Sequence, residues 1–401
     1  MTLFAQHGYG KSTKIERGIQ QGLLSGVILS PKDESEPNLR SYVQSLRSDF
    51  PHIEVMLDPQ FYHVPIPNAN VRNLPSYANL YPGPLPLSSF RGRQIQTYVN
   101  DVLNYQDQLG TSYLVSPSII VNSFSDREAQ VVLNLAQEAI DLHKQNNYNQ
   151  SDLLISLTIH ETAFTNTAQM DSFLNEISIL DAKGFYLIIV RNTSDYNQLF
   201  DNNTALVNIL TFIYSLSEIN EFRVIMGYSD FLGLLYLSVG AYSIATGWHN
   251  SLRKFTMKRI LPSTGGRQPR PRYSSAPLLN SILLSELDSA FQQTSVMAQI
   301  MSGTTYDNNI NSAPNPLSAV WDKDTGQMEH WAAINSAITN IISGKPTVTD
   351  KLDSLEQAII RAQGLYSILH SRYVPLETNS NSDHLTIWNT AIADFRALTN
   401  V

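Results

Sequence analysis

The chain has 401 residues, of which 42% are hydrophobic and 15% are charged, and its formal net charge at pH 7 is −8. This length and composition allow a large buried core and exclude a disordered protein. The acidic balance argues against a protein that coats nucleic acid or membrane through bulk charge, and the lack of cysteine excludes disulfides, thiolate zinc sites and cysteine nucleophiles.

The N-terminal residues do not form a basic segment followed by an apolar stretch. The longest apolar run, residues 231–241, is too short to span a bilayer. We therefore expect a soluble cytoplasmic protein without a membrane partner.

Eight short apolar runs, each followed by a stretch with helical periodicity, predict a series of βα units. The runs are residues 2–6, 26–30, 53–57, 113–121, 153–160, 185–190, 222–227 and 241–246. The amphipathic stretches between them include residues 11–24, 36–48, 126–144, 171–181, 205–217 and 230–239. Eight units in about 250 residues is the number that a closed (β/α)8 TIM barrel needs, and this α/β fold is our prediction. An open doubly wound sheet is the alternative.

A long insertion, residues 62–93, follows the third predicted strand and is dense in proline and tyrosine. Long connections without regular structure are usually functional loops or linkers. Because the insertion follows the C-terminal end of a strand, a barrel would place it over the mouth, where it would act as a lid. The alternative is a proline-stiffened decoration on the outside of the barrel.

A concentrated positive segment begins after the eighth predicted strand. Residues 251–274 contain no acidic residue, and their cations are Arg253, Lys254, Lys258, Arg259, Arg267, Arg270 and Arg272. We expect these side chains to position nucleic-acid phosphates, since arginine suits bidentate phosphate contact. The alternative is a solvated linker that pairs with acidic surface.

The last third of the chain predicts an all-helical unit. Its helical stretches are residues 276–302, 317–343, 349–373 and 383–399. We therefore divide the chain into a barrel over residues 1–260, a basic linker over 261–275 and a helical C-terminal domain over 276–401.

Polar and aromatic residues follow the predicted strands, and a barrel would gather them around one mouth. Such a mixture suits recognition of a planar heterocycle by hydrogen bonds and stacking better than it suits a metal, and we predict neither a metal nor a cofactor. The residues that we expect to bind the substrate are His7, Tyr9, Gln60, Tyr62, Arg191, Tyr228, Trp248 and Asn250.

Asp58, His160 and His249 are the candidate catalytic residues. Asp58 directly follows an apolar strand, where burial raises the pKa of a carboxyl group, so it is the strongest candidate for a general base or a base-edge acceptor. Its alternative role is to cap the turn before Pro59 or to fix the lid. His160 and Glu161 are adjacent and face opposite sides of a strand, so one of them at most points into the site.

Residues 5–12 fit a relaxed phosphate-loop pattern between a strand and a helix. In that interpretation backbone N–H groups cradle a phosphate, Lys11 supplies charge, Ser12 holds magnesium and Asp58 belongs to the companion acidic strand. A phosphate-loop ATPase is therefore one alternative function. The other interpretation is a glycine-rich turn that opens the first helix.

One stretch resembles a known family. Residues 226–230 (Met-Gly-Tyr-Ser-Asp), an apolar helix, residues 239–246 and the basic segment after them resemble the seventh and eighth units of tRNA-guanine transglycosylase-like barrels. Asp58 is similar in placement to the substrate-binding, general-base aspartate of that family. The chain lacks the family's zinc cysteines, and the family's nucleophilic aspartate aligns near Ala245.

The resemblance implies a barrel that recognises a nucleobase or deazaguanine, with nucleic acid such as tRNA or single-stranded DNA as a partner. If the protein is an enzyme, the resemblance implies base exchange or chemistry at an N-glycosidic bond, in nucleic-acid modification or antiphage defence. A non-catalytic barrel scaffold that binds a protein partner is a further alternative.

Overall fold

Eight parallel strands follow one another around a barrel in the computed structural model, which describes residues 3–146, 148, 151–262, 265 and 269–401. Neighbouring strands follow the order β3-β2-β1-β9-β8-β7-β6-β4, and the short strand β5 pairs with the far half of β6. The strands are β1 (Leu3–Gln6), β2 (Gly26–Leu29), β3 (Glu54–Leu57), β4 (Tyr113–Val115), β5 (Ile120–Val121), β6 (Asp152–His160), β7 (Gly184–Arg191), β8 (Arg223–Met226) and β9 (Ser243–Thr246).

Two junctions bring the sheet nearly to closure. The first and the eighth predicted strands pair, with Leu3 opposite Ile244. At the other junction, between β3 and β4, the N–H of Ser112 donates to the carbonyl of Val55 at 2.6 Å, and its hydroxyl accepts from the N–H of Val55 at 2.9 Å. The sheet is a nearly closed barrel, so the predicted (β/α)8 fold is confirmed.

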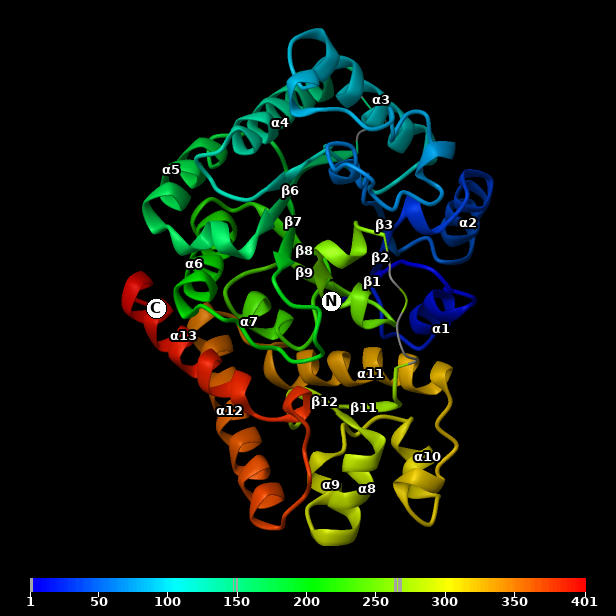
Figure 1. Cartoon of the computed structure of the whole chain (residues 1–401), viewed down its shortest axis with the longest axis vertical. Helices are drawn as coiled ribbons and strands as arrows, with labels where there is room; N and C mark the ends of the chain where they lie inside the picture. Colours follow the sequence, from blue (N-terminus) through cyan, green and yellow to red (C-terminus); the bar gives the residue numbers. More distant parts are fainter. Residues whose placement is uncertain (1–2, 147, 149–150, 263–264, 266–268) are drawn as a thin grey trace.

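Helices surround the barrel (Figure 1), which explains why its strands are apolar on both faces. They are α1 (Lys14–Gln20), α2 (Glu36–Asp49), α3 (Arg93–Leu109), α4 (Arg127–Gln145), α5 (Thr167–Ile177), α6 (Asn203–Tyr214) and α7 (Gly233–Ser238). Each predicted amphipathic stretch overlaps one of these helices. Helix α3, which follows the insertion, was not among the predicted helices.

The chain returns across the mouth of the barrel after β9, and we call residues 247–262 the returning segment. There β10 (Phe255–Thr256) pairs in parallel with the last two residues of β7, Val190 and Arg191. Strand β8 pairs with β7 only as far as Leu187, so β10 continues the sheet where β8 has ended. The first part of the basic segment is thereby held at the C-terminal ends of the strands.

The insertion contacts both the returning segment and the residues that follow β2. The N–H of Asn70 donates to the carbonyl of Ile260 at 2.6 Å, and the Asn73 side chain donates to the carbonyl of Lys32 at 3.2 Å. Arg72 Nη1 donates to Asp33 Oδ1 at 3.0 Å. Residues 70–73 therefore lie over the mouth, and opening of this cover as a lid stays a prediction.

The C-terminal region packs beside the barrel (Figure 1). Its elements are β11 (Arg272–Ser275), β12 (Asn280–Leu283), α8 (Leu284–Gln293), α9 (Met297–Ile300), α10 (Asp307–Asn311), α11 (Lys323–Ile341), α12 (Val348–Ser371) and α13 (Asp383–Thr399). Helices α12 and α13 pack on α7 and α6, and Trp331 of α11 donates its indole N–H to the carbonyl of Thr246 at 2.9 Å. The prediction of helix from residue 276 is wrong for residues 280–283, because β12 pairs there with β11 in an antiparallel hairpin.

Gly184 lies where β7 and β8 approach too closely for a side chain. A Cβ at this position would lie 1.9 Å from the carbonyl oxygen of Arg223, which is backbone and cannot turn away. We expect Gly184→Ala to lower the free energy of unfolding by about 3 kcal/mol, measured by urea denaturation. The matched control is Gly364→Ala, within α12, where no atom lies within 4 Å of the new Cβ. There we expect a gain of about 0.5–1 kcal/mol, and equal effects at the two positions would contradict the strand packing described.

Candidate functional site

Asp58 directly follows β3 and is buried at the mouth, with 1% of its surface exposed. Its Oδ2 accepts hydrogen bonds from Tyr62 at 2.9 Å, Tyr228 at 3.4 Å and Tyr186 at 3.5 Å. Its Oδ1 accepts from the N–H of Gln60 at 3.0 Å. Burial raises the pKa of Asp58 to about 6, although the hydrogen bonds from Tyr62 and Gln60 oppose the shift. Asp58 therefore changes protonation state near neutral pH.

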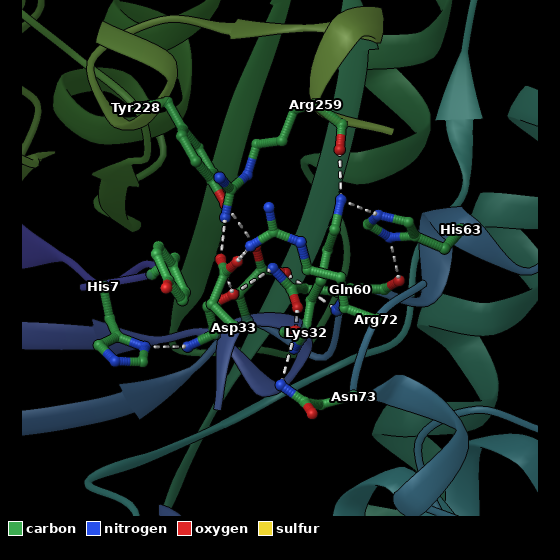
Figure 2. A network of polar contacts seen from close by, with 12 residues as sticks. His7, Lys32, Asp33, Gln60, His63, Arg72, Asn73, Tyr228 and Arg259 are labelled. Atoms are coloured by element: carbon green, nitrogen blue, oxygen red, sulfur yellow. Dashed lines mark hydrogen bonds and ion pairs between the residues drawn. The ribbon is translucent and has the colours of Figure 1, made fainter. Parts of the chain in front are cut away.

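A second buried carboxylate, Asp33, lies in the same mouth (Figure 2). Its pKa shifts in the opposite direction from that of Asp58. Arg259 Nη2 donates to Asp33 Oδ2 at 2.8 Å, and Ser30 Oγ donates to the same oxygen at 2.9 Å. Burial alone would raise the pKa of Asp33, but Arg259, His7, Ser30 and Lys32 together lower it to about 2. Asp33 is therefore ionised at neutral pH.

Arg259 joins the two carboxylates. Besides its ion pair with Asp33, its Nε donates to the hydroxyl of Tyr228 at 3.2 Å, and that hydroxyl in turn donates to Asp58. Burial and the neighbouring Asp58 raise the pKa of Tyr62 well above its usual value, and burial likewise raises the pKa of Tyr228. Both phenols consequently stay protonated and act as donors to Asp58.

Lys32 is a buried amine in the same network (Figure 2). Its Nζ lies 3.2 Å from His63 Nε2 and donates to the backbone carbonyl of Arg259. Burial and the neighbouring Arg259 lower the pKa of Lys32 to about 7. Burial and the neighbouring Lys32 lower the pKa of His63 to about 3. Gln60 fixes this arrangement, since its Oε1 accepts from the N–H of Lys32 at 2.8 Å.

His7 and Trp248 line the side of the mouth near β1. His7 Nδ1 accepts from the N–H of Ser30 at 3.2 Å, whereas its Nε2 has no hydrogen-bond partner among the residues that the structure describes. Burial lowers the pKa of His7 to about 4, so the ring is neutral at pH 7. The Trp248 indole donates to the carbonyl of Tyr9 at 2.9 Å, while the Tyr9 side chain is 70% exposed.

The other two candidate catalytic residues contact different parts of the molecule. His160, at the end of β6, is half-buried and its Nδ1 lies 2.7 Å from the hydroxyl of Thr162. His249 Nδ1 lies 3.3 Å from the side-chain amide of Gln327 on α11, and burial with Lys323 nearby lowers its pKa to about 4. Neither histidine has a hydrogen bond to Asp58 among the contacts of the described residues. Their catalytic roles stay predictions.

Arg191 and Asn250 lie at the rim where β7 and β9 end. Arg191 forms a buried ion pair with Glu161, Nε to Oε2, at 2.5 Å. The Asn250 amide donates to the carbonyl of Ser194 at 2.7 Å. Arg191 also donates through Nη2 to the carbonyl of Leu199, so both side chains hold the loop that follows β7 in place.

Most of the basic segment is folded inside the molecule. Arg253 and Lys254 are 8% and 5% exposed, and Arg259 is bound to Asp33. Arg272, on β11, donates to the carbonyl of Ser281 at 2.6 Å.

The exposed members are Lys258, which donates to Ser194 Oγ at 2.7 Å, and Arg270, which pairs with Glu377 at 2.5 Å. Arg267 lies outside the described residues. Binding of nucleic acid by this segment stays a prediction.

The phosphate-loop-like residues adopt a turn before α1. Helix α1 begins at Lys14, and the amine of Lys11 lies 4.1 Å above the ring of Tyr42. Lys14 Nζ donates to the carbonyl of Gly10 at 3.1 Å and to Ser12 Oγ at 3.2 Å. Use of this turn by a nucleotide stays a prediction.

Neither protein-family models nor curated proteins match the chain. Within the described residues, no group of three or more His, Asp and Glu side chains is arranged to hold a metal ion. The helices of that same part are all too short or too polar to cross a bilayer. The functional interpretation therefore rests on the residues of the mouth.

The raised pKa of Asp58 predicts that the free energy of unfolding depends on pH. A carboxyl whose pKa is about 6 when folded and about 3.8 when unfolded binds its proton more tightly in the native state. The protonated carboxyl therefore stabilises the native state fully below pH 3.8, and this stabilisation is lost as the pH rises through 6. This loss amounts to about 3 kcal/mol at most. Asp58→Asn cannot ionise, so we expect it to gain stability relative to the wild type as the pH rises through this range.

The measurement is urea denaturation of both proteins between about pH 4 and pH 8. The difference between the two proteins is compared, because buried neutral histidines such as His7 change stability in the opposite sense over this range. A constant difference across the range would show that Asp58 has an ordinary pKa.

Proposed function

We propose that the protein binds a small planar heterocycle of the nucleobase class at the barrel mouth and exchanges a proton with it through Asp58. The observation that supports this most is the buried carboxylate of Asp58, which ionises near neutral pH and has no ion-pair partner among the described residues. An ionised buried group without a cation destabilises the fold. Such a group is typical of a site where stability is given up for function.

The two carboxylates of the mouth suit different roles. Their environments separate their pKa values, with Asp58 at about 6 and Asp33 at about 2. In active sites, separated pKa values allow one carboxyl group to transfer a proton while another keeps a fixed charge. Asp58 is the general acid or base, and Asp33 holds Arg259 in place.

The surroundings of Asp58 favour a flat ligand with N–H donors. Its Oδ2 accepts from phenol hydroxyls, and a heterocycle N–H would take the place of one of them. Phe255 packs edge-on against the rings of Tyr62 and Tyr228, at centroid distances of 5.2 and 4.9 Å. Aromatic walls around a hydrogen-bonding edge are how proteins hold a nucleobase outside a helix stack.

A ligand reaches Asp58 only when its cover moves, because the carboxylate is 1% exposed. The cover consists of the insertion near residues 70–73 and the segment that contains Arg259, which bind each other over the mouth. Closure of this cover over a bound substrate would exclude water from the proton transfer.

Because the chain resembles transglycosylase-like barrels, we also propose that it acts at an N-glycosidic bond of its ligand. Ala245, where that family has its nucleophile, lies buried in β9 and carries no reactive group. The proposal therefore includes acid–base work by Asp58 and no covalent intermediate. A base carried by a tRNA or DNA strand is a ligand of the same class.

The test is calorimetric binding with a panel of purines, pyrimidines, deazapurines and their nucleosides. We expect at least one member to bind, and Asp58→Asn to weaken its binding about 10- to 100-fold because a charged hydrogen bond is lost. The matched control is Asp307→Asn, a buried carboxylate of the C-terminal region that accepts from Tyr273 at 2.8 Å. It should leave binding unchanged. A panel without any binder, or equal binding by Asp58→Asn, would overturn the proposal.

A further inference from the structure

One oxygen of Asp58 faces more donors than it can bind well. Three phenol hydroxyls lie around Oδ2, those of Tyr62 at 2.9 Å, Tyr228 at 3.4 Å and Tyr186 at 3.5 Å. An ionised carboxylate oxygen has about two lone-pair sites for hydrogen bonds. The two longer hydrogen bonds are therefore the weak ones, and an N–H group of a ligand can replace one of them.

Of these two weakly bound phenols, Tyr228 is the one nearer to the opening. It follows β8 at the mouth and is 5% exposed, whereas Tyr186 lies on β7 and is 0% exposed. The Tyr186 hydroxyl also packs tightly against Gly227, where a Cβ would lie 2.8 Å from it. The hydroxyl of Tyr228 is therefore better placed to leave Asp58 when a ligand arrives from the mouth.

Arg259 makes Tyr228 a stronger hydrogen-bond donor than an ordinary phenol (Figure 2). The Nε of Arg259 donates to the Tyr228 hydroxyl oxygen at 3.2 Å, and its guanidinium carbon lies 5.1 Å from the centre of the ring. Burial raises the pKa of Tyr228, and the charge of Arg259 opposes that shift. A hydroxyl that accepts a hydrogen bond from a cation is polarised and donates its own proton more strongly.

Asp58 and Tyr228 place one acceptor and one donor side by side. The Oδ2 atom of Asp58 and the hydroxyl oxygen of Tyr228 are 3.4 Å apart. A lactam is a ring N–H group beside a C=O group, and its nitrogen and oxygen are about 2.2 Å apart because both are bonded to the same carbon. A lactam edge can therefore donate to Asp58 and accept from Tyr228 through two nearly parallel hydrogen bonds.

We propose that Tyr228, held by Arg259, donates to a ring carbonyl of the ligand while Asp58 accepts the neighbouring ring N–H. The ligand is then a lactam heterocycle, such as hypoxanthine or uracil. When Asp58 takes the proton, the N–H bond breaks and an O–H bond forms on Oδ2. The electron pair left on nitrogen is shared with the carbonyl oxygen, and Tyr228 donates to that oxygen as its negative charge develops. The proton returns by the reverse step.

This inference deepens the proposed function and rests on it, since it names the class of heterocycle and gives Tyr228 a part in the proton transfer. The ligand reaches both residues as in the proposed function, after the cover has moved. Arg259 belongs to that cover, so the polarised phenol is complete only when the cover is closed. Closure over the ligand therefore brings the donor and the proton acceptor together.

The whole chain is tested by calorimetry with two matched pairs, hypoxanthine with purine and inosine with purine riboside. The second member of each pair lacks the carbonyl oxygen and the N–H beside it. We expect the wild type to bind the lactam member more tightly. Tyr228→Phe should reduce this preference about tenfold, because the hydrogen bond to the carbonyl is lost. The variant keeps the ring that packs edge-on against Phe255.

Tyr62→Phe is the matched control, because Tyr62 donates to the same oxygen of Asp58 at 2.9 Å. It should change the binding of both members of a pair to the same extent and keep the preference of the wild type. If heterocycles bind but the wild type has no preference, or Tyr228→Phe retains it, the inference is wrong and the proposed function stands. If no heterocycle binds the wild type, the proposed function fails and the inference fails with it.

Discussion

Closure of a parallel sheet is the constraint on which the rest of this structure depends. Parallel strands all point their C-terminal ends the same way, so a closed sheet gathers the residues after every strand around one opening. Pairing of β1 with β9 completes one side, and the hydrogen bonds of Ser112 join β3 to β4 on the other. Asp33 and Asp58 follow the neighbouring strands β2 and β3, and Arg259, which follows β10, reaches Asp33 across that opening.

The ion pair of Asp33 and Arg259 turns this opening into a polar site. It holds the returning segment across the mouth and leaves Asp58 with phenol donors in place of a cation. A paired carboxylate and an unpaired one then lie in the same desolvated space, and their pKa values move in opposite directions. The same returning segment brings Arg253 and Lys254 to a small cavity that Arg191 and Asp230 also line. One stretch of chain therefore supplies part of the cover of the site and two buried cations beside it.

The sequence predicted the barrel because each βα unit carries a local signal. Apolar runs, turn residues and helical periodicity are read within one segment, and all eight predicted strands are present. Asp58 was predicted for the same reason, since it directly follows an apolar strand. The partners of a buried charge leave no such signal, because Asp33 and Arg259 are 226 residues apart. Burial of Arg253 likewise depends on the return of the chain across the mouth, which charge patterning does not reveal.

The central claim is that two aspartates of one mouth ionise in separate ranges of pH. Carbon-13 NMR of the side-chain carboxyl groups, assigned with Asp33→Asn and Asp58→Asn, measures this directly in the free protein. The account predicts a titration of Asp58 near pH 6 and of Asp33 near pH 2. An Asp58 resonance that titrates at or below 3.8, the usual value for an aspartate, would contradict it.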